Sequence, residues 1–495
     1  MAFSHADAFA QYKTKNAPQE TPKSESELIL EEAASSEAPV VITLEQALQI
    51  ALSENVSVKV ADMEIQRAQY AKKGSYAALF PQIDATGAYQ RTIKKQVMYM
   101  DFDMSSIMGG AGGEGTELPD GVELPDGVEI PESGEGAAPG GSDNGGGLEV
   151  GRWNTWSAGV SAAMPLVNAQ LWKSLKISGL DVELAVEKAR SSRLDMVTQV
   201  KNAYFATLLA KEAFEVYKQV YENALQNLEE TEKKYRAQKV SDMELLRAKT
   251  TVANAIPNVY NAEGSVILSL WQLKAILGVD LDMNLDVAGK LEDWSEHMFY
   301  DIHQHDSISL DRNTTMKQLA IQAEMLAETI KVQQYANIPS LAVAFNFSYN
   351  AMTNDFNFSE YRWTPYSYVG LSLNIPIFAG GKRYHAIRQA KNQYQQVQLQ
   401  TLNTERQLKI AIRQSLNTME TNMKSYYASK DALAAAQKGY DIVAKSYQVG
   451  RSTLIEVNDA QLALTQAQLG ASQAVYNFLT AKAQLEQTLG QDFVN

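Results

Sequence analysis

The chain has 495 residues, of which 45% are hydrophobic, so its composition is that of a folded protein. It contains no cysteine, which excludes disulfides, thiolate metal sites, cysteine nucleophiles and a lipid-modified N-terminal cysteine. The net charge of -14 is uneven, because residues 101–150 hold twelve acidic and no basic side chains. The remainder is nearly neutral and lacks the clustered positive charge that nucleic-acid binding requires.

Residues 1–41 are expected to form an N-terminal extension. Ala8-Phe9-Ala10 before Gln11 resembles the small-residue end of a signal peptide, although the charged and apolar regions that should precede it are missing. We interpret it as the end of a trimmed export signal. An arbitrary N-terminus is the alternative.

The first half of the chain combines two strands with two helices. Its strands show side chains that alternate between two faces. Glycine is missing from 180 to 263, which permits long helices, with Gly179 tolerated near the start of the first. No proline occurs between Pro165 and Pro257, which also permits a very long helix. The predicted unit is 42–277, with strands at about 82–99 and 153–166 and helices at 169–238 and 241–276.

The acidic segment 101–150 is predicted to be an external loop between the two strands. Its central part, 109–147, is of low complexity, and a solvated disordered loop is favoured over weak binding of divalent cations. Residues 110–115 match the pattern GxGxxG, but no strand precedes them and no helix follows. Nucleotide binding is therefore excluded.

The second half repeats this order after a segment at 278–310. The predicted unit is 311–490, with strands at about 340–351 and 362–377 and helices at 382–448 and 453–488. The longer helix carries a heptad pattern, which is typical of helices that pack along a shared supercoil. The residues in this pattern are Ile412, Leu416, Met419, Met423, Tyr426, Leu433, Tyr440 and Tyr447.

The two halves are related by an internal duplication. Residues 157–165 align with 368–376, and 235–239 align with 447–451, so the offset of 211 or 212 residues is kept over both landmarks. Each half therefore contributes two strands. Four strands cannot close a barrel, and open edges are not tolerated in lipid, so a membrane-inserted form must be an oligomer.

Aromatic residues gather at the loop ends of the strands, which is typical of a girdle at a membrane interface. A soluble sandwich with aromatic packing is the alternative. The membrane-interface candidates are Trp153, Trp156, Tyr361 and Trp363.

The whole pattern resembles the TolC-like outer-membrane factor family over residues 42–490. The match is carried by residues 42–48 (ITLEQAL), 79–83 (LFPQI), 376–381 (PIFAGG) and 447–461 (YQVGRSTLIEVNDAQ). Combined with the duplication, these motifs make a specific signal.

The resemblance implies a mixed α and β fold with internal duplication. In this fold, long helices form a tunnel, which is an α-barrel of coiled coils. The tunnel joins a transmembrane β-barrel with four strands per protomer and twelve in a trimer. It places the chain in the bacterial outer membrane with a tunnel in the periplasm, where a periplasmic adaptor and an inner-membrane pump of the RND or ABC type engage it. Residues 278–310 become an equatorial belt around the tunnel.

The resemblance also implies a gate at the two helical turns, 238–242 and 450–453. A ring of carboxylates at a narrow point favours cations. The alternative is that these acids only stabilise helix starts. The gate and selectivity candidates are Glu244, Tyr447, Glu456 and Asp459, and the candidates for adaptor contact are Lys239, Gly450, Arg451 and Ser452. Near the turn, where the family pattern has an arginine for gate-closing links, this chain has Ser452 with Arg451 beside it, so the resemblance does not establish a locking network here.

No catalytic constellation, cofactor motif or metal site is predicted. His297, His303 and His305 lie close together in sequence, but a surface cluster is favoured over a metal site. The predicted function is the exit duct of a tripartite efflux system. The alternatives are the outer-membrane duct of a type I protein or polysaccharide secretion system and, more remotely, a soluble coiled-coil scaffold.

Overall fold

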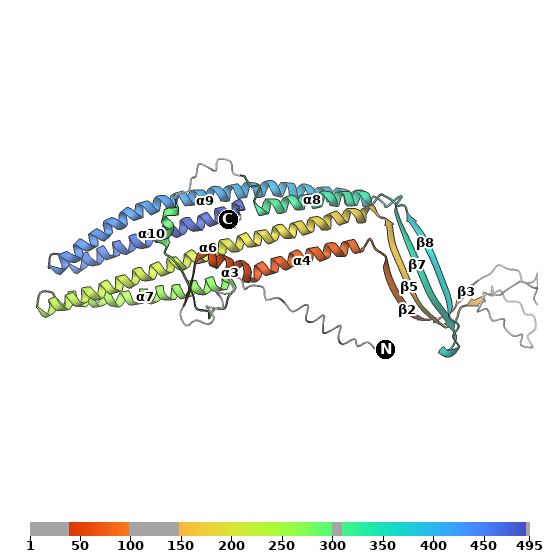
Figure 1. The fold of residues 1–495 in the computed structure, drawn as a ribbon, viewed down its shortest axis with the longest axis horizontal. Coiled ribbons are helices and arrows are strands. Elements are labelled where there is room, and N and C mark those ends of the chain that lie inside the picture. Colours follow the sequence, from red (N-terminus) through yellow and green to blue (C-terminus); the bar gives the residue numbers. More distant parts are fainter. Residues whose placement is uncertain (1–38, 99–147, 299–308, 492–495) are drawn as a thin grey trace, which may run out of the picture. The chain divides into compact units, whose positions relative to one another are not determined.

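The structure, a computed structural model, describes residues 39–98, 148–298 and 309–491 (Figure 1). The signal-peptide interpretation, the acidic loop 109–147 and two of the clustered histidines, His303 and His305, lie outside these ranges. None of the helices within them is both long and apolar enough to cross a membrane.

The described elements follow one another in a mixed α and β order. They are β1 (Val40–Ile42), α3 (Leu44–Glu54), α4 (Val56–Ala77), β2 (Gln82–Arg91), β3 (Gln96–Met98), β4 (Leu148–Val150), β5 (Asn154–Val167), α6 (Ala169–Arg236), α7 (Asp242–Leu277), β6 (Leu285–Val287), the 3-10 helix η1 (Leu291–Met298), α8 (Thr314–Tyr335), β7 (Ser340–Thr353), the 3-10 helix η3 (Phe358–Glu360), β8 (Thr364–Asn374), α9 (Lys382–Gln448) and α10 (Leu454–Leu489).

The chain divides into two compact units. The sheet unit comprises residues 73–175 and 331–387, and the helical unit comprises the rest. Both halves of the sequence contribute to each unit, so the boundaries of the units differ from those of the predicted repeats.

The sheet unit contains one antiparallel sheet with the strand order β2-β5-β7-β8 (Figure 1). The two middle strands come from different halves of the sequence. On the outer strand β8, Val369, Leu371 and Leu373 are 72%, 70% and 61% exposed. The sheet therefore presents an apolar surface that nothing in the described protomer covers.

The first strand is shorter than the predicted 82–99. β2 ends at Arg91, and pairing resumes only in the separate two-stranded ladder of β3 and β4. The interruption contains Lys94 and Lys95, whose charged side chains do not extend the apolar alternation of the sheet.

The helical unit contains two pairs of long helices. α6 and α9 have 68 and 67 residues, and α7 and α10 have 36 residues each. These matching lengths agree with the internal duplication. On α9, the heptad residues Ile412, Met419 and Tyr426 are buried, because they face the neighbouring helices.

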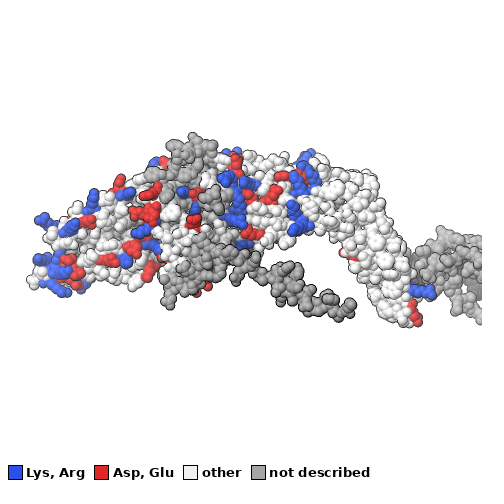
Figure 2. Space-filling view, in the orientation of Figure 1, with Lys and Arg blue, Asp and Glu red and all other residues white. Residues whose placement is uncertain are grey.

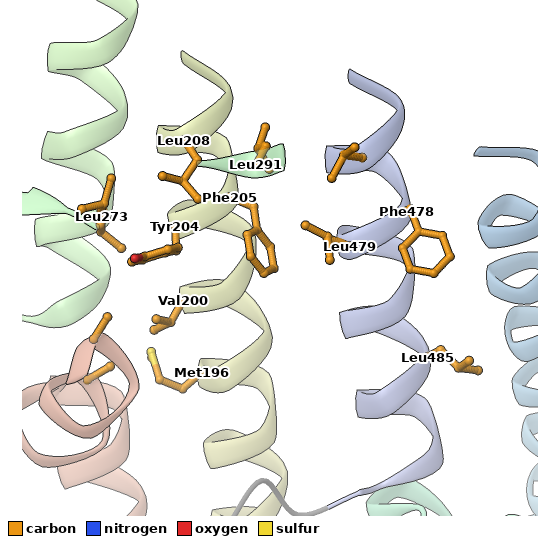
Figure 3. Packing of buried hydrophobic residues seen from close by; sticks show 14 of the residues in the cluster. Met196, Val200, Tyr204, Phe205, Leu208, Leu273, Leu291, Phe478, Leu479 and Leu485 are labelled. Carbon is orange, nitrogen blue, oxygen red and sulfur yellow. The ribbon is translucent and has the colours of Figure 1, made fainter. Parts of the chain in front are cut away.

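The main core lies where α6, α7, α9 and α10 meet the segment around β6 and η1. Phe205 and Leu208 of α6, Phe478 of α10 and Leu291 of η1 are almost fully buried there (Figure 3). Such burial of large apolar side chains is the main favourable contribution to folding.

A parallel pair of short strands, β1 and β6, was not predicted. Val40–Ile42 pairs with Leu285–Val287, so residues before the predicted start of the first repeat at 42 join the segment predicted as the equatorial belt. Tyr204 of α6 secures the pair, because its hydroxyl donates to the carbonyl oxygens of Ala288 (2.7 Å) and Ile42 (3.2 Å). Strands of three residues are too short for their alternation to be recognised.

Candidate functional site: the turns of the long helical hairpins

The two turns that join the long helices have the same backbone geometry. In the second turn, Gly450 has φ +77°, and the N–H groups of Gly450 and Arg451 donate to the carbonyl oxygens of Tyr447 and Ser446 at 3.0 and 2.8 Å. This is the Schellman ending of a helix, in which a left-handed residue terminates the last turn.

The first turn repeats this arrangement without a glycine. Gln238 has φ +56°, and the N–H groups of Gln238 and Lys239 donate to the carbonyl oxygens of Tyr235 and Lys234, each at 2.8 Å. The equivalence of 238 and 450 follows the offset of 212 residues, so the duplication extends to the hydrogen bonds of the turns.

The predicted gate residue Glu456 also takes part in a helix cap. Thr453 precedes α10, and its Oγ1 accepts from the N–H of Glu456 at 3.3 Å, while the Thr453 N–H donates to Glu456 Oε2 at 2.8 Å. This reciprocal pair is a capping box. Glu456 therefore stabilises the start of α10 while its side chain stays exposed, and Asp459, one turn later, is exposed as well.

Tyr447, a predicted gate residue, is 2% exposed and lies within the protomer. Its ring packs with Ala248, Leu454 and Val457, and its hydroxyl lies 2.6 Å from Thr231 Oγ1. Its role at the gate stays a prediction. Within the protomer, the buried ring joins the ends of α6, α7, α9 and α10.

Lys234 holds the same tyrosine from a second side. Its Nζ lies 3.6 Å from the centroid of the Tyr447 ring and donates to the Tyr447 carbonyl oxygen. This contact combines a cation–π interaction with a second hydrogen bond to a carbonyl at the end of α9, which also accepts from the Gly450 N–H. Lys234 belongs to the first half and Tyr447 to the second, so the contact links the two hairpins.

Burial shifts the pKa values of Tyr447 and Lys234 in this cluster. It raises the pKa of the Tyr447 phenol, and the neighbouring Glu244 carboxylate raises it further against the opposing effect of the Thr231 hydrogen bond. Burial likewise lowers the pKa of Lys234, while the carboxylates of Glu230 and Glu244 oppose that change. Of the predicted gate residues, the structure thus brings Glu244 and Tyr447 together.

The predicted adaptor-contact residues lie on the surface of the turns. Lys239, Gly450 and Arg451 are exposed, and Ser452 is half-buried. Sequence reasoning missed Thr231 and Lys234. The duplication could not reveal them, because the equivalent residues of the second half are Val443 and Ser446. Thr231 and Lys234 lie 216 and 213 residues before Tyr447, so no local pattern indicates these contacts.

The predicted interface aromatics separate into two kinds. Trp153 and Trp363 are 38% and 42% exposed, whereas Tyr361 is 9% exposed. The Tyr361 hydroxyl donates to the Asp355 carbonyl oxygen at 2.9 Å, so this side chain holds its own loop instead of facing outward. Trp156 is half-buried and stacks on Tyr89 with ring centroids 4.3 Å apart.

The part of the chain that the structure describes contains no group of three or more His, Cys, Asp or Glu side chains placed to hold a metal ion. The side chain of His297 is outside that part.

Comparison with known proteins agrees with this architecture. Residues 133–279 and 307–491 match the model of the family described as outer membrane efflux protein. Outer membrane protein TolC of Vibrio cholerae is 21% identical over 342 residues, which cover 68% of this chain and 76% of that protein. The proteases secretion protein PrtF of Dickeya chrysanthemi is 20% identical over 358 residues, which cover 68% and 73%.

A solved structure shows the same fold. The outer membrane channel CmeC of Campylobacter jejuni superposes with a TM-score of 0.65 at 16% identity, covering 90% of this chain and 85% of that one. The predicted fold class, a helical tunnel with a β domain, is therefore confirmed, and the soluble-scaffold alternative is wrong. The chain belongs to the outer membrane efflux protein family and is an outer-membrane channel protein with a TolC-like fold.

Proposed function

We propose that the chain is one protomer of a trimeric channel, the exit duct of a tripartite efflux system. Within the described residues, the four-stranded sheet has β2 and β8 as its edge strands, each with one unpaired edge, and this observation carries the proposal. Unpaired strand edges cannot be left open in lipid, and four strands are too few to close on themselves. Three protomers that pair β2 with β8 of the next form a closed barrel of twelve strands.

Disulfide trapping tests this assembly in a chain that has no native cysteine. Thr86→Cys on β2 is combined in turn with single cysteines at 366–372 on β8, and the membranes are oxidised. We expect dimer and trimer bands for at least one combination. A control pair on the neighbouring inner strands, Ser157→Cys with Asn350→Cys, should link only within one chain. If every combination of Thr86→Cys with a β8 cysteine gave only monomer bands, the proposed trimer would be contradicted.

The turns of the hairpins are proposed as the periplasmic gate and the contact for an adaptor. The exposed carboxylates of Glu456 and Asp459 supply negative charge, and Glu244 lies on the corresponding turn of the other hairpin. Three copies of this charge at a narrow opening would attract cations. The buried Tyr447 is assigned a positioning role, because it holds the helix ends that carry these acids.

Adaptor contact is proposed for Lys239, Gly450, Arg451 and Ser452, which lie on the two equivalent turns. The proposed partners are a periplasmic adaptor and an inner-membrane pump of the RND or ABC type. The role is that of a passive channel without catalysis.

The second candidate is the exit duct of a type I secretion system, for proteins or polysaccharide. The similarity to the proteases secretion protein PrtF supports this candidate. Its sequence identity and coverage are nearly the same as those of TolC. Deleting the gene in its host distinguishes the two. Efflux predicts greater sensitivity to small toxic compounds with unchanged secreted proteins, whereas secretion predicts the loss of a secreted product alone.

A further inference from the structure

Four bases lie where the β2–β5 ladder ends, one in its last pair and three in the irregular segment beyond it. The last pair of that ladder is Arg91 with Asn154, and the β3–β4 ladder begins with Gln96 opposite Val150. Between them, residues 92–95 of one strand face 151–153 of the other, and one hydrogen bond, from the Thr92 N–H to the Trp153 carbonyl oxygen (2.8 Å), spans the gap.

The side chains of this segment are basic without an acidic counterpart. Arg91, Lys94 and Arg152 are exposed, and Lys95 is half-buried with its Nζ 5.1 Å from the centroid of the Trp153 ring. No carboxylate among the described residues forms an ion pair with any of the four. Because the two ladders flank residues 92–95 of one strand and 151–153 of the other, they hold the four cations at one end of the sheet, and this group is here called the basic segment.

The surface beside the basic segment is apolar and then aromatic. Strands β5, β7 and β8 contain no charged residue, and Asp84 is the one acid of β2. Figure 2 shows this almost uncharged face, with both basic and acidic atoms where it ends. Next to that end, Trp156 packs against Phe358 with centroids 5.0 Å apart, and Trp153 remains exposed.

The order of aliphatic, aromatic and cationic residues matches the order of groups in a phosphorylated lipid. Acyl chains would contact the strands, the aromatic rings suit the interface, and cations suit the phosphate. Arginine and lysine donors form short, charge-assisted hydrogen bonds with phosphate oxygens.

We propose that Arg91, Lys94, Lys95 and Arg152 bind the phosphate groups of a phosphorylated glycolipid in the outer leaflet. The proposal rests on the proposed function, which makes the sheet unit the membrane part and its loop end the external one. The acidic residues within 101–150 also carry charge opposite to that of the basic segment. A lipid is favoured, because a soluble polyanion would not explain why the cations continue an apolar and aromatic surface.

The test measures lipid retained by the full-length protein. The protein is incorporated into phosphatidylcholine nanodiscs that contain either bisphosphorylated lipid A or its dephosphorylated form, and bound lipid is counted by native mass spectrometry. The test variant replaces all four bases of the basic segment with glutamine. A matched control replaces four exposed bases of α9, Lys391, Arg413, Lys430 and Lys438, with glutamine.

We expect the parent and the α9 control to retain the phosphorylated lipid in preference to the dephosphorylated one. The test variant should lose this preference, by roughly fivefold in affinity for each base removed. The double substitution Lys94→Arg with Lys95→Arg should keep it, which separates charge from folding. Equal retention by the parent and the test variant would overturn the proposal.

Two further arms separate the possible sources of anionic charge. In the first arm, inorganic phosphate is added at the concentration of the lipid, and complete displacement of the lipid would show an unspecific anion site. In the second arm, residues 111–146 are deleted, and lipid binding that appears only then would show that the acidic segment occupies the bases. Either result contradicts lipid binding by the parent. Native mass spectra of the same samples also give the oligomeric state. Absence of the trimer would contradict the channel proposal, whereas a trimer without lipid preference would contradict the lipid site alone.

Discussion

At the scale of single residues, equivalent tyrosines of the two halves have different environments. Tyr447 is 2% exposed and bonded to Thr231, whereas Tyr235, which aligns with it, is 38% exposed. The duplicated sequence thus places one tyrosine between the hairpins and its counterpart on the surface. This difference makes Tyr235 a natural control for Tyr447.

The substitution Tyr447→Phe is expected to weaken the link between the hairpins. It removes the hydroxyl beside Thr231 Oγ1 and keeps the ring under Lys234, so the expected loss is about 1 kcal/mol of unfolding free energy. Leak of the channel in planar bilayers should rise. Denaturant titration and conductance measure both effects, and Tyr235→Phe should change neither. Similar effects of the two substitutions would mean that the buried contact has no special role.

The Glu456 side chain both completes the capping box of α10 and carries a negative charge. Substitution by glutamine distinguishes the two roles. Glutamine at this position preserves a capping box while it removes the charge. The double variant Glu456→Gln with Asp459→Asn is therefore expected to raise relative anion conductance and to weaken block by multivalent cations, at unchanged thermal stability. Planar-bilayer recordings provide the measurement. Unchanged ion selectivity would mean that these acids only stabilise the start of α10.

At the scale of elements, the short strands β1 and β6 depend on a residue of α6. The Tyr204 hydroxyl donates to carbonyl oxygens on both sides of this pair, and burial, followed by the nearby Asp286 carboxylate, raises its pKa to about 12. The neutral phenol is required, because the deprotonated oxygen has no hydrogen to donate to a carbonyl.

This bond predicts a loss of stability in alkali. The folded-state pKa of Tyr204 lies above the value of about 10 in unfolded chains, so its contribution is complete below pH 10 and disappears as the pH rises towards 12. The difference in melting temperature between the parent and Tyr204→Phe should therefore narrow over that interval. Melting curves at a series of pH values test this, and a constant difference would contradict the assignment.

At the scale of the whole molecule, the acidic segment stands apart from the folded protein in composition. Residues 109–147 contain nine acids, no bases and fourteen glycines, so they offer little apolar surface to offset the entropy of ordering. They separate the strand pair β2 and β5, whose ten-residue register is complete without them. A long insertion at such a place costs little, because loop-closure entropy grows only logarithmically with length.

Deletion of 111–146 is therefore expected to leave trimer assembly and membrane insertion intact. The measurement compares the deletion with the parent by the yield of heat-resistant trimer and by efflux of a substrate at low and high salt. A difference in efflux that salt removes would reflect the negative field of the segment. Loss of the trimer would show that the segment folds as part of the channel.

The sequence alone was sufficient for the fold class and the family. Local signals carried both. The spans without proline and glycine predict long helices, the alternation in β7 and β8 predicts strands, and the four motifs together with the duplication indicate the family. Each of these signals depends on the chain's own covalent geometry or on residues close in sequence.

Only the tertiary structure shows which side chains contact one another across elements. The contact of Lys234 and Thr231 with Tyr447, the anchoring of β1 and β6 by Tyr204, and the burial of Tyr361 all depend on contacts between elements or on the folding of a loop. The basic segment likewise arises because the pairing of β2 with β5 and of β3 with β4 sets residues 92–95 beside 151–153. No periodicity specifies such contacts, because they depend on the register in which distant segments pack.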